Sequence, residues 1–487
     1  MPEFYKKYKK EISLLAGILL FLVFFFANPL ALADKSKLVL SLAVLMICWW
    51  VLEAMPLAVV ALLPLVLYPL LSINTIKETS RSYSDSIIYL FMGGFFLGIA
   101  IEKWQLHKRI ALNIIKLTGT NGNNIILGFI LSTGFISMWL SNTATTMMMF
   151  PIAASVIHVI SQHANPNANI KNFSLALMMS LAYASNFGGI ATIIGTPPNV
   201  AYIRHLNDHY GHSIDFLQWM LLCMPLSMVL LLCLYWVMVK WLYPNHLSHS
   251  VDGRNFILSE LKEMGPLSKQ EKRVMLVFCT TAFLWITKDI INSQQKIFQL
   301  DDSIIALLGA ISLFIVPSGR SVEKPEERLL EWTDTKNMAW GILLLFGGGI
   351  AMAKSLEEAK LMEELGQYIA SYATSNILVL IFIVTLISVF LSEVMSNIAQ
   401  VIVMAPVISA VADALHINPL LLGIPMTLGA SCAGMLPMGT PPNAIVFSSG
   451  HIKLHQMLKT GFVMNIIAVI LITLFSWLLL PLIVPNF

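Results

Sequence analysis

The chain has 487 residues, of which 57% are hydrophobic and only 12% are charged. Soluble domains carry about 25% charged residues, so this composition excludes a soluble multidomain enzyme and predicts one all-α polytopic membrane domain. The formal net charge of +3 says little about partners, and no basic patch interleaved with aromatic residues suggests nucleic-acid binding.

The N-terminal segment predicts how the chain is oriented. Lysines at positions 6, 7, 9 and 10 precede the first apolar run. Cytoplasmic flanks of membrane helices are enriched in such charge, so we expect a cytoplasmic N-terminus. The run 12–33 ends in ALAD, which resembles a signal-peptidase site. Because the run exceeds a signal-peptide core and many more spans follow, we expect a retained helix.

Apolar runs along the chain predict about eleven transmembrane helices, since one crossing takes about 20 apolar residues. Two further regions, 123–160 and 376–412, are too long for one crossing and carry a polar cluster in the middle. A re-entrant helical hairpin explains each, where protein or water surrounds its turn. The predicted spans are 12–33, 38–52, 56–73, 86–102, 174–203, 214–243, 273–292, 301–317, 339–354, 418–448 and 459–484.

The chain also contains an internal repeat. LFMGG at 90–94 matches LFGGG at 345–349, and SMWLSNTATTMMMFP at 137–151 matches SEVMSNIAQVIVMAP at 392–406, both at an offset of 255 residues. GTPPN occurs twice, at an offset of 244. Three matched blocks in the same order indicate two related halves. We favour an inverted repeat, the organisation of many secondary transporters, over a parallel one.

The repeat divides the chain into three parts. The expected parts are a first half over 1–243 with N-terminal scaffold helices, hairpin 123–160 and broken helix 174–203; a cytoplasmic polar linker over 244–272 with a short amphipathic helix; and a second half over 273–487 with hairpin 376–412 and broken helix 418–448.

Each predicted hairpin has Ser-Asn at its tip. The tips read Ser141-Asn142-Thr143 and Ser396-Asn397. Ser and Asn are good N-cap residues, so the second arm should begin here. The first turn of a helix has unpaired N–H groups and partial positive charge, which favour an anion. Capping of a tight turn alone would need no ligand, but two copies, each paired with a broken helix, favour a ligand site.

The two GTPPN segments predict helix breaks. Proline lacks an N–H, so each proline pair ends the preceding helix and suits the first turn of the next one. The gap exposes carbonyl groups on one side and N–H groups on the other. A simple proline kink is the alternative, but it requires neither the Gly-Thr before the prolines nor the Asn after them. The residues concerned are Gly195, Thr196, Pro197 and Asn199, and Gly439, Thr440, Pro441 and Asn443.

Oxygen groups near these breaks predict cation sites. A hard cation such as Na⁺ takes hydroxyl, amide and carbonyl oxygens. Ser137 lies on the helical face of Ser141, four residues before it. No carboxylate is needed, which suits a releasable ion. The expected shells are Ser137, Asn142 and the Gly195 carbonyl, and Ser392, Asn397 and the Gly439 carbonyl.

With these motifs, the sequence resembles the divalent anion/sodium symporter family, the sodium/dicarboxylate transporters. The resemblance rests on SNTATTMMMFP, the second SN motif and both GTPPN segments, and it runs from about Trp49 to the C-terminus. It implies transport of C4 or C5 dicarboxylates such as succinate, malate, fumarate or 2-oxoglutarate, sometimes citrate. It also implies a homodimer in which a transport domain moves against a scaffold domain as an elevator.

The resemblance implies roles for individual residues. Sodium would sit near the two expected shells, and no other cofactor is implied. The second tip departs from many relatives, because Ile398 stands where they have Thr. The lost hydroxyl leaves the preferred dicarboxylate open. The resemblance also leaves coupling open, because the family contains both Na⁺ symporters and Na⁺-independent exchangers. The retained Ser and Asn side chains slightly favour Na⁺ symport. Substrate carboxylates would meet Ser141, Asn142, Thr143, Thr196, Pro197, Ser396, Asn397, Thr440 and Pro441.

Other polar groups have simpler expected roles. Glu53 and Glu393 lie in or beside apolar runs, where an acid is a functional candidate. We expect hydrogen-bonding roles near helix ends, with a proton relay as the alternative. His205, Asp208, His209 and His212 have loose metal-ligand spacing, and we expect a solvated loop there. The five cysteines are scattered, contain no C-x-x-C and are expected to be small buried residues.

Three alternatives to a dicarboxylate carrier remain. The same N–H cradle could hold citrate or an inorganic oxyanion such as sulfate. An anion channel is a second class, which two closed hairpins oppose. An intramembrane enzyme is a third, and no His placed beside an intramembrane Ser supports it. With no organelle signal, we expect a location in the cytoplasmic membrane of the cell.

Overall fold

The computed structural model describes residues 8–28, 33–119, 121–162, 169–211, 214–245, 247, 251–319, 327–371 and 376–483. Within them the chain is helical, with one isolated antiparallel bridge between Pro317 and Arg328. Eight helices in this part of the chain are long and apolar enough to cross a membrane. The predicted all-α polytopic fold is therefore confirmed.

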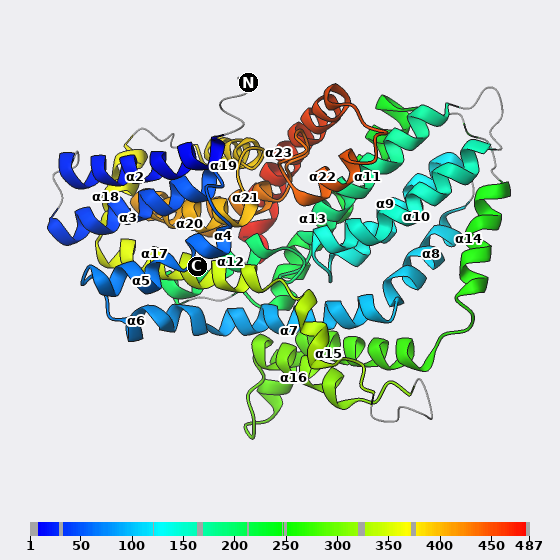
Figure 1. The fold of residues 1–487 in the computed structure, drawn as a ribbon, viewed down its shortest axis with the longest axis horizontal. Coiled ribbons are helices and arrows are strands. Elements are labelled where there is room, and N and C mark those ends of the chain that lie inside the picture. The colour runs from blue at the N-terminus through cyan, green and yellow to red at the C-terminus, as the bar shows by residue number, and fades with distance from the viewer. Residues whose placement is uncertain are drawn as a thin grey trace.

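The N-terminal helices cover one side of the molecule and lead into the long helix α7 (Figure 1). The expected span 56–73 is instead two short helices, because Pro64 lacks the N–H that would bond to the preceding turn. The bounds are α2 Lys9–Ala27, α3 Asp34–Val51, α4 Leu57–Val60, α5 Leu63–Leu70, α6 Ile76–Arg81, the 3₁₀ turn η1 Ser82–Ser84, α7 Ser86–Lys103 and α8 Leu106–Thr118.

Both predicted hairpins form. The first consists of α9 (Gly122–Ser137) and α10 (Asn142–Gln162), and the second of α19 (Ile377–Leu391) and α20 (Asn397–Ala414). Each turn falls at the predicted Ser-Asn tip. An amphipathic helix that the sequence analysis did not identify packs on each hairpin: α8 lies on α9, and α18 (Leu361–Ala370) lies on α20.

Both broken helices form as well, and their gaps are longer than a proline kink. α11 (Ile170–Gly189) is separated from α12 (Pro197–Tyr210), and α21 (Leu420–Ala430) from α22 (Pro441–Phe447). Proline occupies the first turn of α12 and of α22, as predicted. The halves interlock, since α10 packs on α22 and α12 packs on α20.

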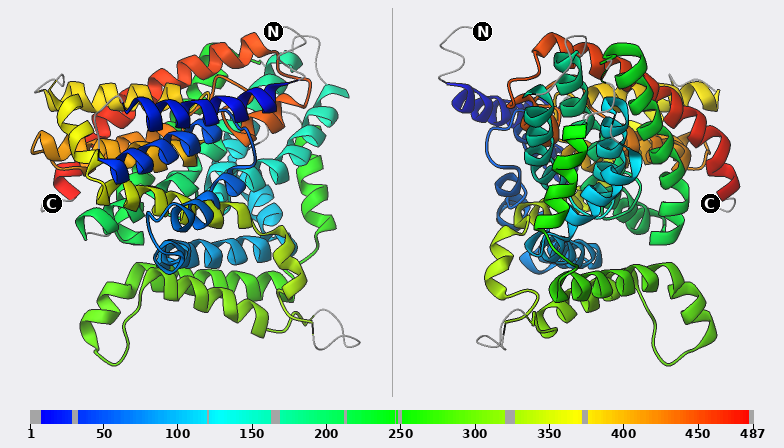
Figure 2. Two further views of the ribbon diagram at one scale, coloured as in Figure 1. Left: turned by 60° about the vertical axis from the view of Figure 1, so that its left-hand side comes forward. Right: turned by 90° about the vertical axis from the view of Figure 1, so that its right-hand side faces the viewer.

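The remaining helices complete the core and one edge. α15 and α16 form a layer against α7 (Figure 2). The remaining helical elements are α13 Phe216–Trp236 with its π-helical extension η2 Val237–Leu242, α14 Val251–Glu263, α15 Lys269–Gln294, α16 Asp302–Ile315, the 3₁₀ turn η3 Trp332–Asn337, α17 Trp340–Glu358 and α23 Leu454–Ile483.

The repeated glycine motifs allow close helix packing. A Cβ on Gly93 of α7 would lie 2.6 Å from the Ala306 carbonyl oxygen of α16. At the equivalent position in α17, a Cβ on Gly348 would lie 2.3 Å from the Ala61 carbonyl oxygen. Only glycine fits these contacts, so the LFMGG and LFGGG matches mark equivalent packing positions in the two halves.

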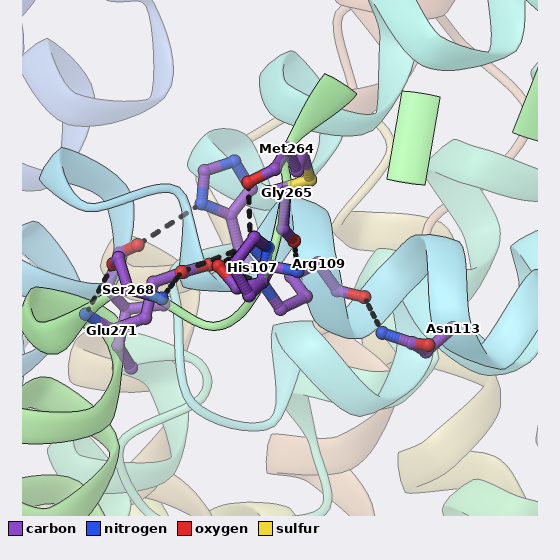
Figure 3. A network of polar contacts seen from close by, with 9 residues as sticks. His107, Arg109, Asn113, Met264, Gly265, Ser268 and Glu271 are labelled. Atoms are coloured by element: carbon purple, nitrogen blue, oxygen red, sulfur yellow. Dashed lines mark hydrogen bonds and ion pairs between the residues drawn. The ribbon is translucent and has the colours of Figure 1, made fainter. Parts of the chain in front are cut away.

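The polar linker is fixed to the first half at its C-terminal end. Arg109 of α8 donates to Glu271 Oε1 at 2.5 Å and Oε2 at 3.1 Å, and to the carbonyl groups of Gly265 and Met264 at 2.9 and 3.2 Å (Figure 3). Glu271 also accepts from the Ser268 N–H. The expected amphipathic helix in the linker is α14, which packs on α8 and α10. The linker therefore braces the first hairpin.

Candidate functional site

The first tip joins the hairpin to the broken helix beside it. Ser137, the last residue of α9, donates its hydroxyl to Asn142 Oδ1 at 2.9 Å and to the Ser185 carbonyl at 2.8 Å. Ser141 caps α10 as predicted, accepting from the Ala144 N–H at 3.3 Å. Ser137 is fully buried, whereas Ser141 and Asn142 are half-buried. The tip is therefore partly accessible at Ser141 and Asn142.

Backbone oxygens converge on the glycine of the first GTPPN segment. A Cβ on Gly195 would lie 2.4 Å from the Gly189 carbonyl oxygen and 3.0 Å from those of Ser137 and Met138. A Cβ on Gly189 would lie 2.2 Å from Asn142 Oδ1. The structure therefore brings together Ser137, Asn142 and Gly195, the three residues of the first predicted shell. Gly189, which sequence analysis missed, adds a carbonyl oxygen.

The second tip repeats this geometry. Ser392 donates to Asn397 Oδ1 at 2.8 Å and to the Ala430 carbonyl at 2.5 Å. Ser396 begins α20 without a side-chain capping bond, in contrast to Ser141. Matching hydrogen bonds at residues about 250 positions apart show that the sequence repeat is also a structural repeat.

The amides that follow the prolines in both GTPPN segments stabilise the unwound segments. Asn199 Nδ2 donates to the Thr192 carbonyl at 2.8 Å, and Asn443 Nδ2 donates to the Ala433 and Leu436 carbonyls at 3.2 and 3.1 Å. Both amides are fully buried. Each Asn therefore holds the carbonyl groups of its own gap in place.

Glu393 has no counterpart in the first half, where Met138 occupies the equivalent position. Its carboxylate accepts the N–H groups of Gly434, Met435 and Leu436 at 2.8, 2.8 and 3.0 Å. It also accepts from Asn465 Nδ2 at 2.7 Å. The expected hydrogen-bonding role near a helix end is confirmed. Three of the partners belong to the unwound segment between α21 and α22, and Asn465 belongs to α23.

Asn186 links the two halves, and sequence analysis missed it. It accepts from Asn142 Nδ2 at 3.4 Å and donates to Thr440 Oγ1 at 3.3 Å. The first tip and the second GTPPN segment therefore meet at this fully buried side chain. The available signal was a buried polar Ser-Asn pair, Ser185 and Asn186, inside an otherwise apolar span.

The other expected substrate residues differ in exposure. Thr143, Pro197 and Ser396 are half-buried and Pro441 is exposed, whereas Thr196 and Thr440 are buried. Thr440 accepts from the Asn443 N–H at 3.3 Å, which caps α22. Helices α10, α12, α20 and α22 all begin at the tips and breaks, and they pack as two crosswise pairs.

A cavity of about 570 Å³ runs alongside the second of these pairs. Ala201 of α12 and Ile402 of α20 lie at the end nearer the tips, and Arg204, Lys354 and Glu357 line it farther along. Arg204 forms ion pairs with Asp85 and Asp208. The cavity thus has charged side chains at its walls, and none of the predicted site residues lines it. A smaller cavity of about 80 Å³ touches Ser141.

The predicted histidine loop is wrong. His205, Asp208 and His209 lie on α12, which continues from Pro197 until Gly211 ends it with φ +64°. His212 lies outside the described residues. His205 Nε2 is 2.8 Å from Ser409 Oγ, and His209 Nδ1 is 3.0 Å from Glu357 Oε1.

These polar contacts hold α12 against α17 and α20. The hydrogen bond to Glu357 raises the pKa of His209 above its ordinary value. Among the described residues, no group of three or more His, Cys, Asp or Glu side chains is arranged to hold a metal ion. Glu53 lies just past α3 with φ +49° and is exposed, and the hydrogen bonds of the described residues do not include one to its side chain, so the expected hydrogen-bonding role is not confirmed there.

Comparison with known proteins identifies relatives along nearly the whole chain. A family model described as the sodium:sulfate symporter transmembrane region matches residues 7–484. A sodium-dependent dicarboxylate transporter, SdcS, of Staphylococcus saprophyticus is 37% identical over 476 residues, covering 96% of this chain and 91% of the relative. SdcS of Staphylococcus aureus strain MRSA252 is 38% identical over 494 residues, covering 99% and 94%.

A solved structure supports the architecture. The crystal structure of the YdaH transporter of Alcanivorax borkumensis aligns with a TM-score of 0.58, covering 82% of this chain and 86% of that one. The aligned residues are 11% identical, so this likeness concerns the fold alone.

Proposed function

This chain belongs to the sodium:sulfate symporter family, and from that premise we propose that it is a secondary active transporter of C4 or C5 dicarboxylates coupled to Na⁺. The relatives named above are sodium-dependent dicarboxylate transporters. The observation that carries the proposal is the repeated geometry of the tips, where Ser137 bonds to Asn142 and Ser392 bonds to Asn397 at the starts of α10 and α20.

The anion would bind at the helix N-termini. Partly exposed Ser141, Asn142, Ser396 and Asn397 lie at the first turns of α10 and α20. Their side chains and the free N–H groups of those turns can donate hydrogen bonds to carboxylate oxygens. Two carboxylates, one for each pair of N-termini, match a short dicarboxylate. Thr143, Thr196, Pro197, Thr440 and Pro441 complete the proposed substrate set.

Sodium would bind next to the anion rather than far from it. In the first shell, the Asn142 amide oxygen and the carbonyls around Gly195 supply the oxygen ligands that Na⁺ prefers. In the second, Ser392 and Asn397, which are hydrogen-bonded to each other, would act together with the Gly439 carbonyl. Because Asn142 and Asn397 belong to both sets, a bound cation would orient the amide whose N–H₂ faces the substrate. This shared residue gives a physical basis for coupling.

We propose that alternating access moves the hairpins and broken helices together against the remaining helices, as an elevator. The crosswise packing of α10 on α22 and α12 on α20 supports a single moving body. The cavity along α12 and α20 would serve as the substrate's access route. A homodimer in the cell membrane, with a cytoplasmic N-terminus, completes the proposal.

Sulfate is the second candidate substrate, since the matching family model is described as a sodium:sulfate symporter region. A tetrahedral oxyanion would use one pair of helix N-termini, whereas a dicarboxylate would use both. The double cradle favours the dicarboxylate.

Counterflow into proteoliposomes tests the proposal. Vesicles loaded with unlabelled succinate should take up labelled succinate transiently above equilibrium, which a channel cannot do. Malate, fumarate and 2-oxoglutarate in excess should suppress this uptake, and sulfate should not. Suppression by sulfate alone, or sulfate uptake without succinate uptake, would assign the carrier to the oxyanion.

A further inference from the structure

Two proposed cation sites of the same design differ in one respect. Around Gly195, the nearest atoms are the carbonyl oxygens of Gly189, Ser137 and Met138. Around Gly439, the nearest atom is a side-chain oxygen, because a Cβ there would lie 2.9 Å from Glu393 Oε2. The Leu436 carbonyl oxygen follows at 3.3 Å. The neutral carbonyls of the first site are thus partly replaced by a carboxylate in the second.

The carboxylate is buried and held from four directions. Glu393 is 4% exposed. All four of its hydrogen-bond partners are N–H donors, three from the backbone of 434–436 and one from Asn465. Such an arrangement suits an ionised carboxylate, which accepts hydrogen bonds only. The described residues show no Lys or Arg ion pair to Glu393.

The segment that Glu393 holds also approaches Gly439, because the Leu436 carbonyl oxygen would lie 3.3 Å from a Cβ there. The Tyr183 hydroxyl donates to the Gly434 carbonyl at 2.7 Å, and Asn443 Nδ2 donates to the carbonyls of Ala433 and Leu436. The N–H groups of this segment are therefore fixed by Glu393, and several of its carbonyls by amide and hydroxyl donors. In the first half, the Thr192 hydroxyl instead bonds to the Met138 carbonyl.

We propose that Glu393 is a positioning residue that makes the second sodium site the tighter of the two. Its negative charge lies beside Gly439 in a buried environment, where charges interact more strongly than in water. A cation bound at Ser392 and Asn397 would be attracted by that negative charge. A cation bound at Ser137 and Asn142 would be surrounded only by neutral oxygens. The second site therefore fills at lower sodium concentration than the first. This inference rests on the proposed function, because it assumes that both shells bind Na⁺.

Sodium-dependent thermal stability of the purified full-length protein tests the inference without substrate or transport. Unfolding is followed against NaCl concentration, with choline chloride holding the ionic strength constant. A ligand that binds only the folded state raises stability with its concentration. Wild type should be stabilised, and Glu393→Gln should need at least about tenfold more sodium for the half-maximal shift, since one buried charge is lost.

A matched variant separates charge from structure. Glu271 is also buried and multiply hydrogen-bonded, through Arg109 and Ser268. Glu271→Gln should lower thermal stability and leave the half-maximal sodium concentration unchanged. Glu393→Asp keeps the charge and should shift that concentration less than about threefold. If Glu393→Gln does not fold, Glu393→Asp is measured alone. A tenfold shift in the half-maximal sodium concentration of Glu393→Asp would overturn the assignment of the effect to charge.

The outcomes distinguish the inference from the proposed function. A normal sodium response in Glu393→Gln overturns the inference and leaves sodium coupling intact. No sodium response in the wild type overturns both the sodium sites and the inference.

Discussion

Replacing Gly195 by Ala should weaken sodium binding at the first site. The new methyl group would lie 2.4 Å from the Gly189 carbonyl oxygen and 3.0 Å from those of Ser137 and Met138. All three are backbone atoms, so no side-chain rotation can relieve the contact. Overpacking of this kind costs about 1–3 kcal/mol. If the carbonyl groups move apart to relieve it, that cost corresponds to about a 5- to 150-fold loss of sodium affinity.

The assay is the sodium dependence of succinate uptake in proteoliposomes. Gly195→Ala should raise the sodium concentration for half-maximal uptake and recover part of its rate at high sodium. Gly341→Ala is the control, because its nearest neighbour is the Ala58 Cβ at 3.3 Å, away from either shell. Unchanged sodium dependence in Gly195→Ala would show that these carbonyls do not surround a transported cation.

Three further changes have defined outcomes. Ser137→Ala removes the hydroxyl that holds Asn142. Because one hydrogen bond contributes about 1 kcal/mol, this change should reduce sodium affinity by about tenfold or less. An unchanged sodium titration would contradict this prediction. Tyr183→Phe leaves the Gly434 carbonyl without its donor and should lower stability by about 1–3 kcal/mol in thermal unfolding; a wild-type melting temperature refutes this. Pairing with Glu357 raises the pKa of His209, so the pairing stabilises the fold at acidic pH and is lost as pH rises above that raised value. The wild type should lose up to about 1 kcal/mol more than His209→Gln between pH 5.5 and 8.5, and equal losses would exclude a contribution of this pair.

The breaks and turns of the fold could be predicted because their causes are local. Proline pairs end helices, and Ser-Asn pairs begin them, so the hairpin tips and the starts of α12 and α22 fall where the sequence indicates. The lengths of the gaps could not be predicted, because distant residues also hold these segments. Met138 and Trp219 bond to residues 190–196, and Glu393 and Tyr183 bond to residues 431–440.

The site was predicted only in part, because only contacts between residues close in sequence could be predicted. Ser137 and Asn142 are five residues apart and share one turn, so spacing alone brought them together. Asn186 bonds to Thr440 across 254 residues, and Glu393 bonds to Asn465 across 72. No local pattern encodes such partners. The amphipathic helix α8 was missed because its charged face interrupts the apolar runs by which spans are recognised.

The central claim is that a sodium gradient drives dicarboxylate uptake through this protein. The most direct measurement is accumulation of labelled succinate by empty proteoliposomes, with NaCl or choline chloride outside. We expect labelled succinate to accumulate when NaCl is outside the vesicles and not to accumulate when choline chloride is outside. Uptake that requires succinate inside the vesicles and ignores sodium would instead identify an exchanger and contradict both proposed cation sites.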